Sequence, residues 1–122
     1  MNCIGIDIIE IARIQMAIAR WGERFLRRVY TEPELELCRG RAPELAARFA
    51  AKEAVMKALG TGSKGANWRD IEVLSDPAGK PVVNLYNRAQ NKADQLKFSQ
   101  LAISLSHSRE HAIACATAVS NG

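Results

Sequence analysis

The spacing of hydrophobic residues predicts a strand followed by a helix at the start of the chain. Residues 3–9 are rich in β-branched side chains that recur with a period of two, which is typical of a strand with two different faces. One face carries isoleucines and the other carries Gly5 and Asp7, so Asp7 is an acid set into a strand. From residue 10 the apolar side chains recur at helical spacing until Gly22, which predicts a helix over residues 10–21.

The rest of the chain combines helices with hairpins. Thr31 and Glu34 form a capping box that starts a short helix, and a longer helix runs from about Glu44 to Leu59 before Gly60 ends it. The other predicted elements are strands over residues 70–75, 82–86, 101–107 and 112–119, and a helix over residues 87–96. We therefore predict one α+β domain over residues 1–122, with a largely antiparallel sheet packed against the long alanine-rich helix.

Composition narrows the class of protein only slightly. The 122 residues include 48% hydrophobic and 25% charged residues, which is ordinary for a folded globular domain. The net charge of +4 favours anionic partners, but so small a surplus decides little. The three cysteines lie far apart without C-x-x-C spacing, which argues against a disulfide framework or a zinc site. Because no apolar run is long enough to span a bilayer, we expect a cytoplasmic protein without a membrane partner.

The long helix has an alanine side and a charged side. Its small side chains collect on one face, which allows close approach to a sheet; they are Ala46, Ala47, Ala50, Ala51, Ala54 and Ala58. Phe49, Glu53 and Lys57 follow one another at intervals of four residues on a neighbouring stripe. Taken alone, this spacing favours an exposed helical ion pair between Glu53 and Lys57, worth about 0.3–0.5 kcal/mol.

A magnesium and phosphate site is the chemical alternative. If the alanine face packs on the sheet, Asp7 can face Glu53, and two carboxylates with open water positions suit Mg²⁺. Arg48, Lys52 and Lys57 could supply positive charge to a diphosphate, together with backbone amides of residues 60–65. The glycine-rich loop does not match a P-loop, because it follows its helix instead of preceding it, so a helix C-cap at Gly60 is its simpler interpretation.

Five segments together resemble the holo-acyl-carrier-protein synthases, the small 4′-phosphopantetheinyl transferases. The segments are Gly5–Ile14 (GIDIIEIARI), Arg48–Ala54 (RFAAKEA), Lys57–Gly62 (KALGTG), Gly79–Pro81 (GKP) and Leu105–Ser108 (LSHS). They occur in order and at suitable spacing over nearly the whole chain. The resemblance implies a 4′-phosphopantetheinyl transferase fold and a magnesium-dependent transfer of 4′-phosphopantetheine from coenzyme A to a serine of apo-acyl carrier protein, with release of adenosine 3′,5′-bisphosphate.

The resemblance also implies roles for individual residues. Asp7 and Glu53 would hold the metal and Lys57 would contact the diphosphate, which makes these three the expected catalytic residues. The positions expected to line the coenzyme A site are Arg48, Phe49, Lys52, Lys57, Gly60, Gly62, Pro81, His107 and Ser108. The family forms homotrimers with sites at the subunit boundaries, and it docks its acidic carrier on the first helix and the following segment, which favours Arg13, Arg24 and Arg28.

The sequence leaves open which group is the general base and what role some individual residues have. A metal-oriented water, Glu53 or Asp7 could accept the serine proton. Without the resemblance, His107 is an ordinary strand-end histidine, and His111 is expected to be a surface or hairpin residue. The resemblance assigns no role to Lys64 in the loop of residues 63–67.

Two other functions fit part of the pattern. A metal-dependent nuclease commonly places its acidic and lysine residues at adjacent positions of a strand, whereas Glu53 and Lys57 have helical spacing, so we expect no nucleic-acid partner. A non-catalytic coenzyme A or nucleotide-binding module would keep the basic residues but would have no need of Asp7.

Overall fold

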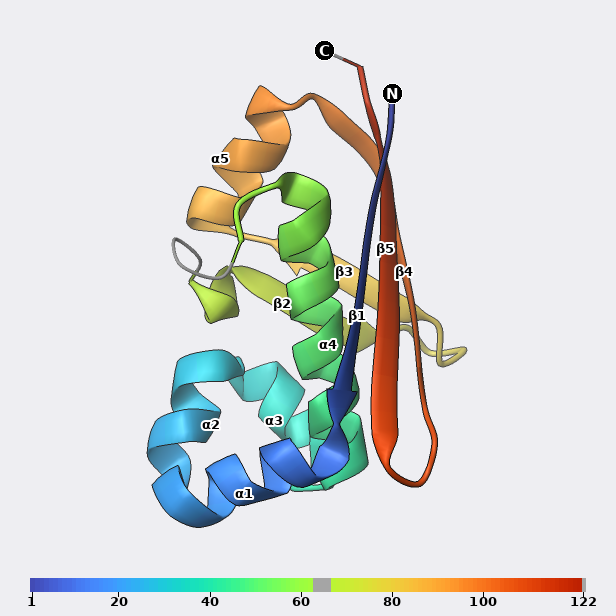
Figure 1. Ribbon diagram of the computed structural model, residues 1–122. Coiled ribbons are helices and arrows are strands. Elements are labelled where there is room, and N and C mark those ends of the chain that lie inside the picture. The colour runs from blue at the N-terminus through green and yellow to red at the C-terminus, as the bar shows by residue number, and fades with distance from the viewer. Residues whose placement is uncertain (63–66, 122) are drawn as a thin grey trace.

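Three long strands form an antiparallel sheet along one side of the molecule (Figure 1). In this computed structural model, which describes residues 1–62 and 67–121, the strand order is β1-β5-β4. β1 spans Asn2–Glu10, β4 spans Phe98–His107 and β5 spans His111–Ser120. β5 lies in the centre because it pairs with both β1 and β4. The terminal strands of the sequence therefore meet in one sheet, and the predicted β4–β5 hairpin is confirmed.

A second, two-stranded antiparallel sheet is made by β2 (Ile71–Ser75) and β3 (Pro81–Leu85). The turn between them is stabilised by Asp76, whose carboxylate accepts hydrogen bonds from the amides of Ala78 and Lys80. A short 3₁₀ helix, η1 (Trp68–Asp70), leads into β2, and α5 (Asn87–Gln95) follows β3. All strand pairs are antiparallel, so the predicted α+β class is confirmed.

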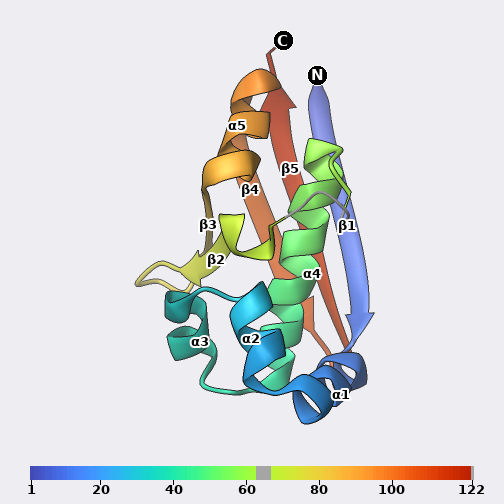
Figure 2. The ribbon, with the colours of Figure 1, turned by 90° about the vertical axis from the view of Figure 1, so that its left-hand side faces the viewer.

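Helix α4 (Ala42–Leu59) packs across the three-stranded sheet, with β1 on one side and the β2–β3 hairpin on the other (Figure 2). Its alanines are buried, as their clustering on one helical face predicts. Gly5 of β1 contacts the helix backbone so closely that an added Cβ would lie 1.9 Å from the carbonyl oxygen of Ala54. Gly60 ends α4 in the left-handed conformation, with φ of 75°, which confirms the predicted C-cap.

Three shorter helices gather at the end of the molecule where β1 finishes (Figure 1). They are α1 (Ile11–Trp21), α2 (Glu23–Val29) and α3 (Glu32–Cys38). The predicted capping box is present: Glu34 donates its amide to Thr31 Oγ1, and the Glu34 carboxylate accepts from the Thr31 amide. The basic segment after Gly22, to which the hydrophobic pattern assigned no element, forms α2.

The face of the three-stranded sheet that points away from α4 is exposed. Ile4, Ile6 and Ile8 of β1 are 69%, 56% and 62% exposed, and Ile113 of β5 is 40% exposed. Asp7 and Gly5 point to the opposite face, toward α4, as the period of two predicts. In the described parts of the chain, no helix combines the length and the apolar character needed to cross a membrane.

Candidate functional site

The strand acid and the helix acid line one open cavity. Asp7 projects from β1 toward α4, and both Asp7 and Glu53 border a cavity of about 310 Å³. The cavity is also lined by two aromatic rings and one cation: Phe49 of α4, Phe25 of α2 and Arg13 of α1. The close approach at Gly5 brings β1 and α4 together, and it thereby allows two carboxylates 46 residues apart in the sequence to share one cavity.

The charges of Asp7 and Lys57 act on Glu53 in opposite directions. Burial, and secondarily the negative charge of Asp7, raise the pKa of Glu53, whereas the ammonium of Lys57 opposes the shift. Lys57 donates to the carbonyl oxygen of Ile6 at 2.8 Å and to Asp7 Oδ1 at 3.2 Å. Because the Lys57 side chain is 52% exposed, its ion pair with Asp7 contributes at most about 1 kcal/mol. The ammonium can therefore exchange Asp7 for a phosphate oxygen at little cost.

The donor set fits a hard divalent cation that keeps part of its water shell. Within residues 1–62 and 67–121, no group of three or more His, Cys, Asp or Glu side chains could hold a metal. Asp7 and Glu53 would thus supply two carboxylate ligands, which matches the habit of Mg²⁺ to bind through one or two carboxylates, waters and substrate phosphate. The pKa of Glu53 is raised first by burial and second by the negative charge of Asp7, and a bound cation would offset both effects.

A second cavity, of about 370 Å³, holds another part of the predicted set. It is lined by Arg48 of α4, Pro81 of β3 and His107 of β4, together with Glu44. Glu44 accepts a hydrogen bond from Arg48 Nη1 at 2.7 Å and lies 3.5 Å from His107 Nε2. The Glu44 carboxylate therefore lies between Arg48 and His107. Glu44 was not among the site residues expected from the sequence, although its spacing of four residues from Arg48 is typical of a helical ion pair.

Ser108 lies just beyond this cavity, in the turn between β4 and β5. Its amide donates to the carbonyl oxygen of His111 at 2.8 Å, so Ser108 is held as a turn residue in this chain. His111 starts β5 and is exposed, in agreement with its expected place in the hairpin.

The two cavities open on opposite sides of α4. Glu53 and Glu44 are nine residues apart, which is two and a half turns at about 100° per residue. Their side chains therefore point in opposite directions from the helix axis. Residues of β1 and α1 line one cavity, whereas residues of the β2–β3 hairpin and β4 line the other. β1 and the β2–β3 hairpin lie on opposite sides of α4 (Figure 2). A single copy of the chain therefore keeps Phe49 apart from Arg48, Pro81 and His107.

Lys52 is in neither cavity. Its side chain is fully buried and its ammonium is paired with Glu34, 2.8 Å away. Burial lowers the pKa of Lys52, and Glu34 counteracts this shift. The expectation that Lys52 lines the coenzyme A site thus disagrees with its placement, because helical spacing from Arg48 does not reveal that α3 and β2 cover this part of α4.

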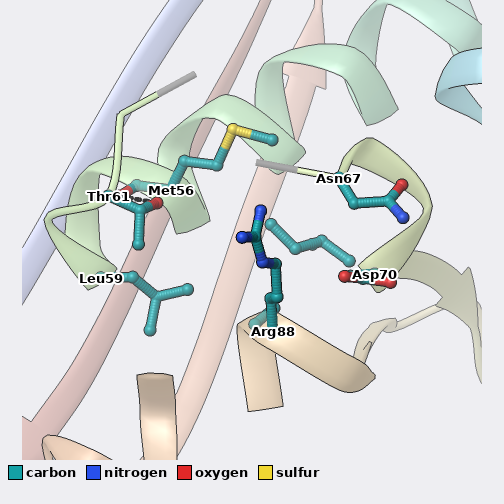
Figure 3. Close-up of a pocket in the computed structure, with 8 residues that line it drawn as sticks. Met56, Leu59, Thr61, Asn67, Asp70 and Arg88 are labelled. Atoms are coloured by element: carbon teal, nitrogen blue, oxygen red, sulfur yellow. Dashed lines mark hydrogen bonds between the residues drawn. The ribbon is translucent and has the colours of Figure 1, made fainter. Parts of the chain in front are cut away.

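The end of α4 borders a small third pocket, shown in Figure 3. Met56, Leu59 and Thr61 contribute from the helix end, and Asp70 and Arg88 contribute from η1 and α5. Gly60 and Gly62 next to it have φ values of 75° and 64°, which favour glycine. Residues 63–66, whose amides were expected to bind phosphate, lie outside the described residues.

The arginines expected to dock the carrier lie near one another at the helical end of the molecule. Arg24 and Arg28 of α2, with Trp21 and Phe25, line a cavity of about 460 Å³, and Arg13 borders the cavity of Asp7 and Glu53. Phe25 lines both cavities and separates the basic one from the acidic one.

A family model and the sequences of related proteins both match this chain and name the same kind of enzyme. Residues 3–116 match the model of the 4′-phosphopantetheinyl transferase superfamily. The holo-[acyl-carrier-protein] synthase of Dehalococcoides mccartyi is 56% identical over 93% of this chain and 95% of that relative. The corresponding synthase of Herpetosiphon aurantiacus is 51% identical over 93% of this chain and 95% of its own length.

Solved structures agree. The synthase of Helicobacter pylori, determined in complex with coenzyme A, superimposes with a TM-score of 0.86 at 35% identity, covering 95% of this chain and 99% of that one. Both the sequence and the fold lead to the same group of enzymes. The chain therefore belongs to the holo-[acyl-carrier-protein] synthases of the 4′-phosphopantetheinyl transferase superfamily.

Proposed function

We propose that this enzyme transfers 4′-phosphopantetheine from coenzyme A to a serine of apo-acyl carrier protein, depends on Mg²⁺ and releases adenosine 3′,5′-bisphosphate. The observation that carries the proposal is the shared cavity of Asp7 and Glu53, with Lys57 bonded to Asp7 at its edge. Family membership and the coenzyme A complex of the Helicobacter pylori relative support the two substrates.

The chemistry follows from the charges in this cavity. Asp7 and Glu53 would hold Mg²⁺, which when bound would neutralise the diphosphate and polarise the phosphoryl group. The serine oxygen of the carrier forms a bond to the β-phosphorus of coenzyme A and gives up its proton to Asp7, Glu53 or a water molecule, while the bond from that phosphorus to the bridging oxygen breaks. Lys57 leaves Asp7 to stabilise or protonate the departing bisphosphate, whose negative charge increases as it leaves. The catalytic residues are therefore Asp7, Glu53 and Lys57.

We propose that a neighbouring copy completes the coenzyme A site in a homotrimer. Phe49, Lys57, Gly60 and Gly62 would come from one copy, while Arg48, Pro81, His107 and Ser108 would come from the next. Two observations support this division: the two cavities open on opposite sides of α4, and the isoleucine face of β1 is exposed. An apolar sheet face of this kind is typical of an interface.

Mixing two inactive variants tests the shared site. Asp7→Asn and Arg48→Ala are each expected to lose activity as homotrimers, because each removes one half of every site. After the two are refolded together in equal amounts, roughly a quarter of the sites should contain two intact halves, and activity should return in proportion. Transfer rates measured before and after mixing check this result. A mixture as inactive as its parents, despite exchange of subunits seen by native mass spectrometry, would contradict a site shared between copies.

The basic cavity on α2 is proposed to dock the carrier. Acyl carrier proteins are acidic, and Arg24 and Arg28 border an open cavity that adjoins the site through Phe25. Arg13 lies on the catalytic side of the same boundary. Complementary charge of this kind accelerates encounter and orients the partner.

Charge reversal at the docking surface is expected to affect the carrier alone. Arg24→Glu should raise the KM of the carrier about tenfold and weaken its dependence on salt, because an attractive charge becomes repulsive. The KM of coenzyme A should not change. Initial rates over a range of carrier and salt concentrations measure this effect. The matched control is Lys92→Glu on α5, at the other end of the molecule (Figure 1); an equal effect of both variants would show a response to net charge alone.

The transfer reaction itself tests the proposed function. With coenzyme A, Mg²⁺ and an apo-carrier, chromatography should detect adenosine 3′,5′-bisphosphate in step with consumption of the carrier, and chelation of the metal should stop its release. Release that continues unchanged after chelation would contradict the proposed metal requirement.

A further inference from the structure

Lys52, the residue before Glu53 on α4, forms a fully buried ion pair with Glu34 that the transfer chemistry does not use. Lys52 and Glu34 have no exposed side-chain area, and Lys52 Nζ lies 2.8 Å from Glu34 Oε1. A buried ion pair often stabilises a fold no more than apolar side chains of similar size would. Stability alone therefore does not account for the Lys52–Glu34 ion pair.

All three protons of the Lys52 ammonium have acceptors. Besides Glu34, they are the carbonyl oxygen of Trp68, at 3.1 Å, and the carbonyl oxygen of Ile71. Glu34 in turn accepts from the amides of Thr31 and Val73, each at 2.8 Å. The pair thus joins α3 and α4 to η1 and β2 through bonds that are mostly to backbone atoms.

The segment held in this way forms the support of the site wall. The Trp68 ring stacks on Phe49, with ring centroids 4.7 Å apart and an interplanar angle of 23°. Phe49 lies 6.5 Å from Phe25 in the same series of rings, and both phenylalanines line the cavity that holds Asp7 and Glu53. A shift of the Trp68 backbone would therefore move the apolar wall beside the carboxylates.

We infer that Lys52 and Glu34 are positioning residues: they hold Trp68 against Phe49 and so fix the apolar wall beside which coenzyme A binds. This inference rests on the proposed function for its substrate. Lys52 acts through Trp68 and does not touch coenzyme A, because its three donors are already used within the protein.

The test needs a variant that removes the ammonium without leaving a buried charge. Lys52→Met alone leaves Glu34 unpaired, so loss of folding is expected from it. The double variant Glu34→Gln, Lys52→Met keeps the side-chain volumes and removes the donor to Trp68 and Ile71, but glutamine keeps only one of the two oxygens that accept from the Thr31 and Val73 amides. Trp68 is then followed by fluorescence without ligand, in a Trp21→Phe background that leaves one tryptophan.

The double variant is expected to be folded by circular dichroism, with Trp68 emission shifted to longer wavelength and quenched more readily by acrylamide than in the Trp21→Phe parent. The KM of coenzyme A should rise about tenfold while kcat changes by less than about twofold, the pattern of lost uniform binding. Lys92→Met, the same substitution on α5, is the matched control and should change neither quantity.

Each other outcome overturns the inference. A raised KM with unchanged Trp68 emission would mean that Lys52 contacts coenzyme A directly, and a shifted emission with unchanged KM would leave the pair a purely structural role. If the parent protein transferred nothing from coenzyme A, the proposed function would fail, whereas the emission of Trp68 without ligand would still test whether the ion pair holds the ring in place.

Discussion

Asp7→Asn and Glu53→Gln are each expected to lower the rate of phosphopantetheine transfer by about 10³-fold while leaving the fold intact. Each substitution keeps the shape of the side chain but removes one of the two negative charges that line the cavity. Without both charges Mg²⁺ would be bound weakly, and the charge that develops on the diphosphate would not be neutralised. Single-turnover rates with saturating coenzyme A measure the loss, and calorimetry with Mg²⁺ measures metal affinity.

Glu36→Gln is the matched control, because Glu36 is exposed on α3 and borders none of the cavities described above. It should transfer at the rate of the parent. Wild-type rates in both cavity variants would remove the metal assignment, and a loss in only one would leave a single carboxylate with a catalytic role. A rise in metal concentration should partly restore Asp7→Asn or Glu53→Gln if weak Mg²⁺ binding is the cause.

Gly5→Ala is expected to be the most damaging substitution outside the charged groups. A Cβ at this position would lie 1.9 Å from the carbonyl oxygen of Ala54 and 2.9 Å from the amide nitrogen of Ala58. These are backbone atoms of α4, so no side chain can rotate away, and β1 must separate from the helix. We expect a loss of about 3 kcal/mol or more in the free energy of unfolding, and a loss of transfer because Asp7 moves away from Glu53.

Gly40→Ala provides the comparison. It places a Cβ in open space, although its φ of 71° makes the change cost about 1 kcal/mol. Urea unfolding followed by circular dichroism measures both variants. Equal stabilities for Gly5→Ala and Gly40→Ala would contradict the close contact between β1 and α4.

Local patterns predict most of the helices and strands and the faces of β1 and α4 on which Asp7 and the alanines lie. The period of two in β1 separates Asp7 from the isoleucines, and the alanines of α4 indicate the face that packs on the sheet. If the alanine face packs on the sheet, these two patterns allow Asp7 to face Glu53, and in the structure both side chains border one cavity. The capping box at Thr31 and the C-cap at Gly60 are likewise determined by a few neighbouring residues.

The environment of each charged side chain could not be predicted in the same way. Arg48, Lys52 and Lys57 have similar chemistry and lie within three turns of α4, but they reach three different surroundings. Arg48 pairs with Glu44, Lys52 is buried against Glu34, and Lys57 is half-exposed beside Asp7. Helical spacing gives the direction of each side chain, but segments distant in the sequence determine what covers it. The same limit applies to the helical form of α2, which depends on its packing.

Mass spectrometry of the carrier protein gives the most direct test of the central claim. The enzyme is incubated with coenzyme A, Mg²⁺ and the apo-acyl carrier protein of its own organism, and the intact carrier is weighed before and after. The proposed function predicts a gain equal to one 4′-phosphopantetheine group per carrier, located on a serine and absent with Asp7→Asn. An unmodified carrier after incubation with the folded enzyme would contradict it.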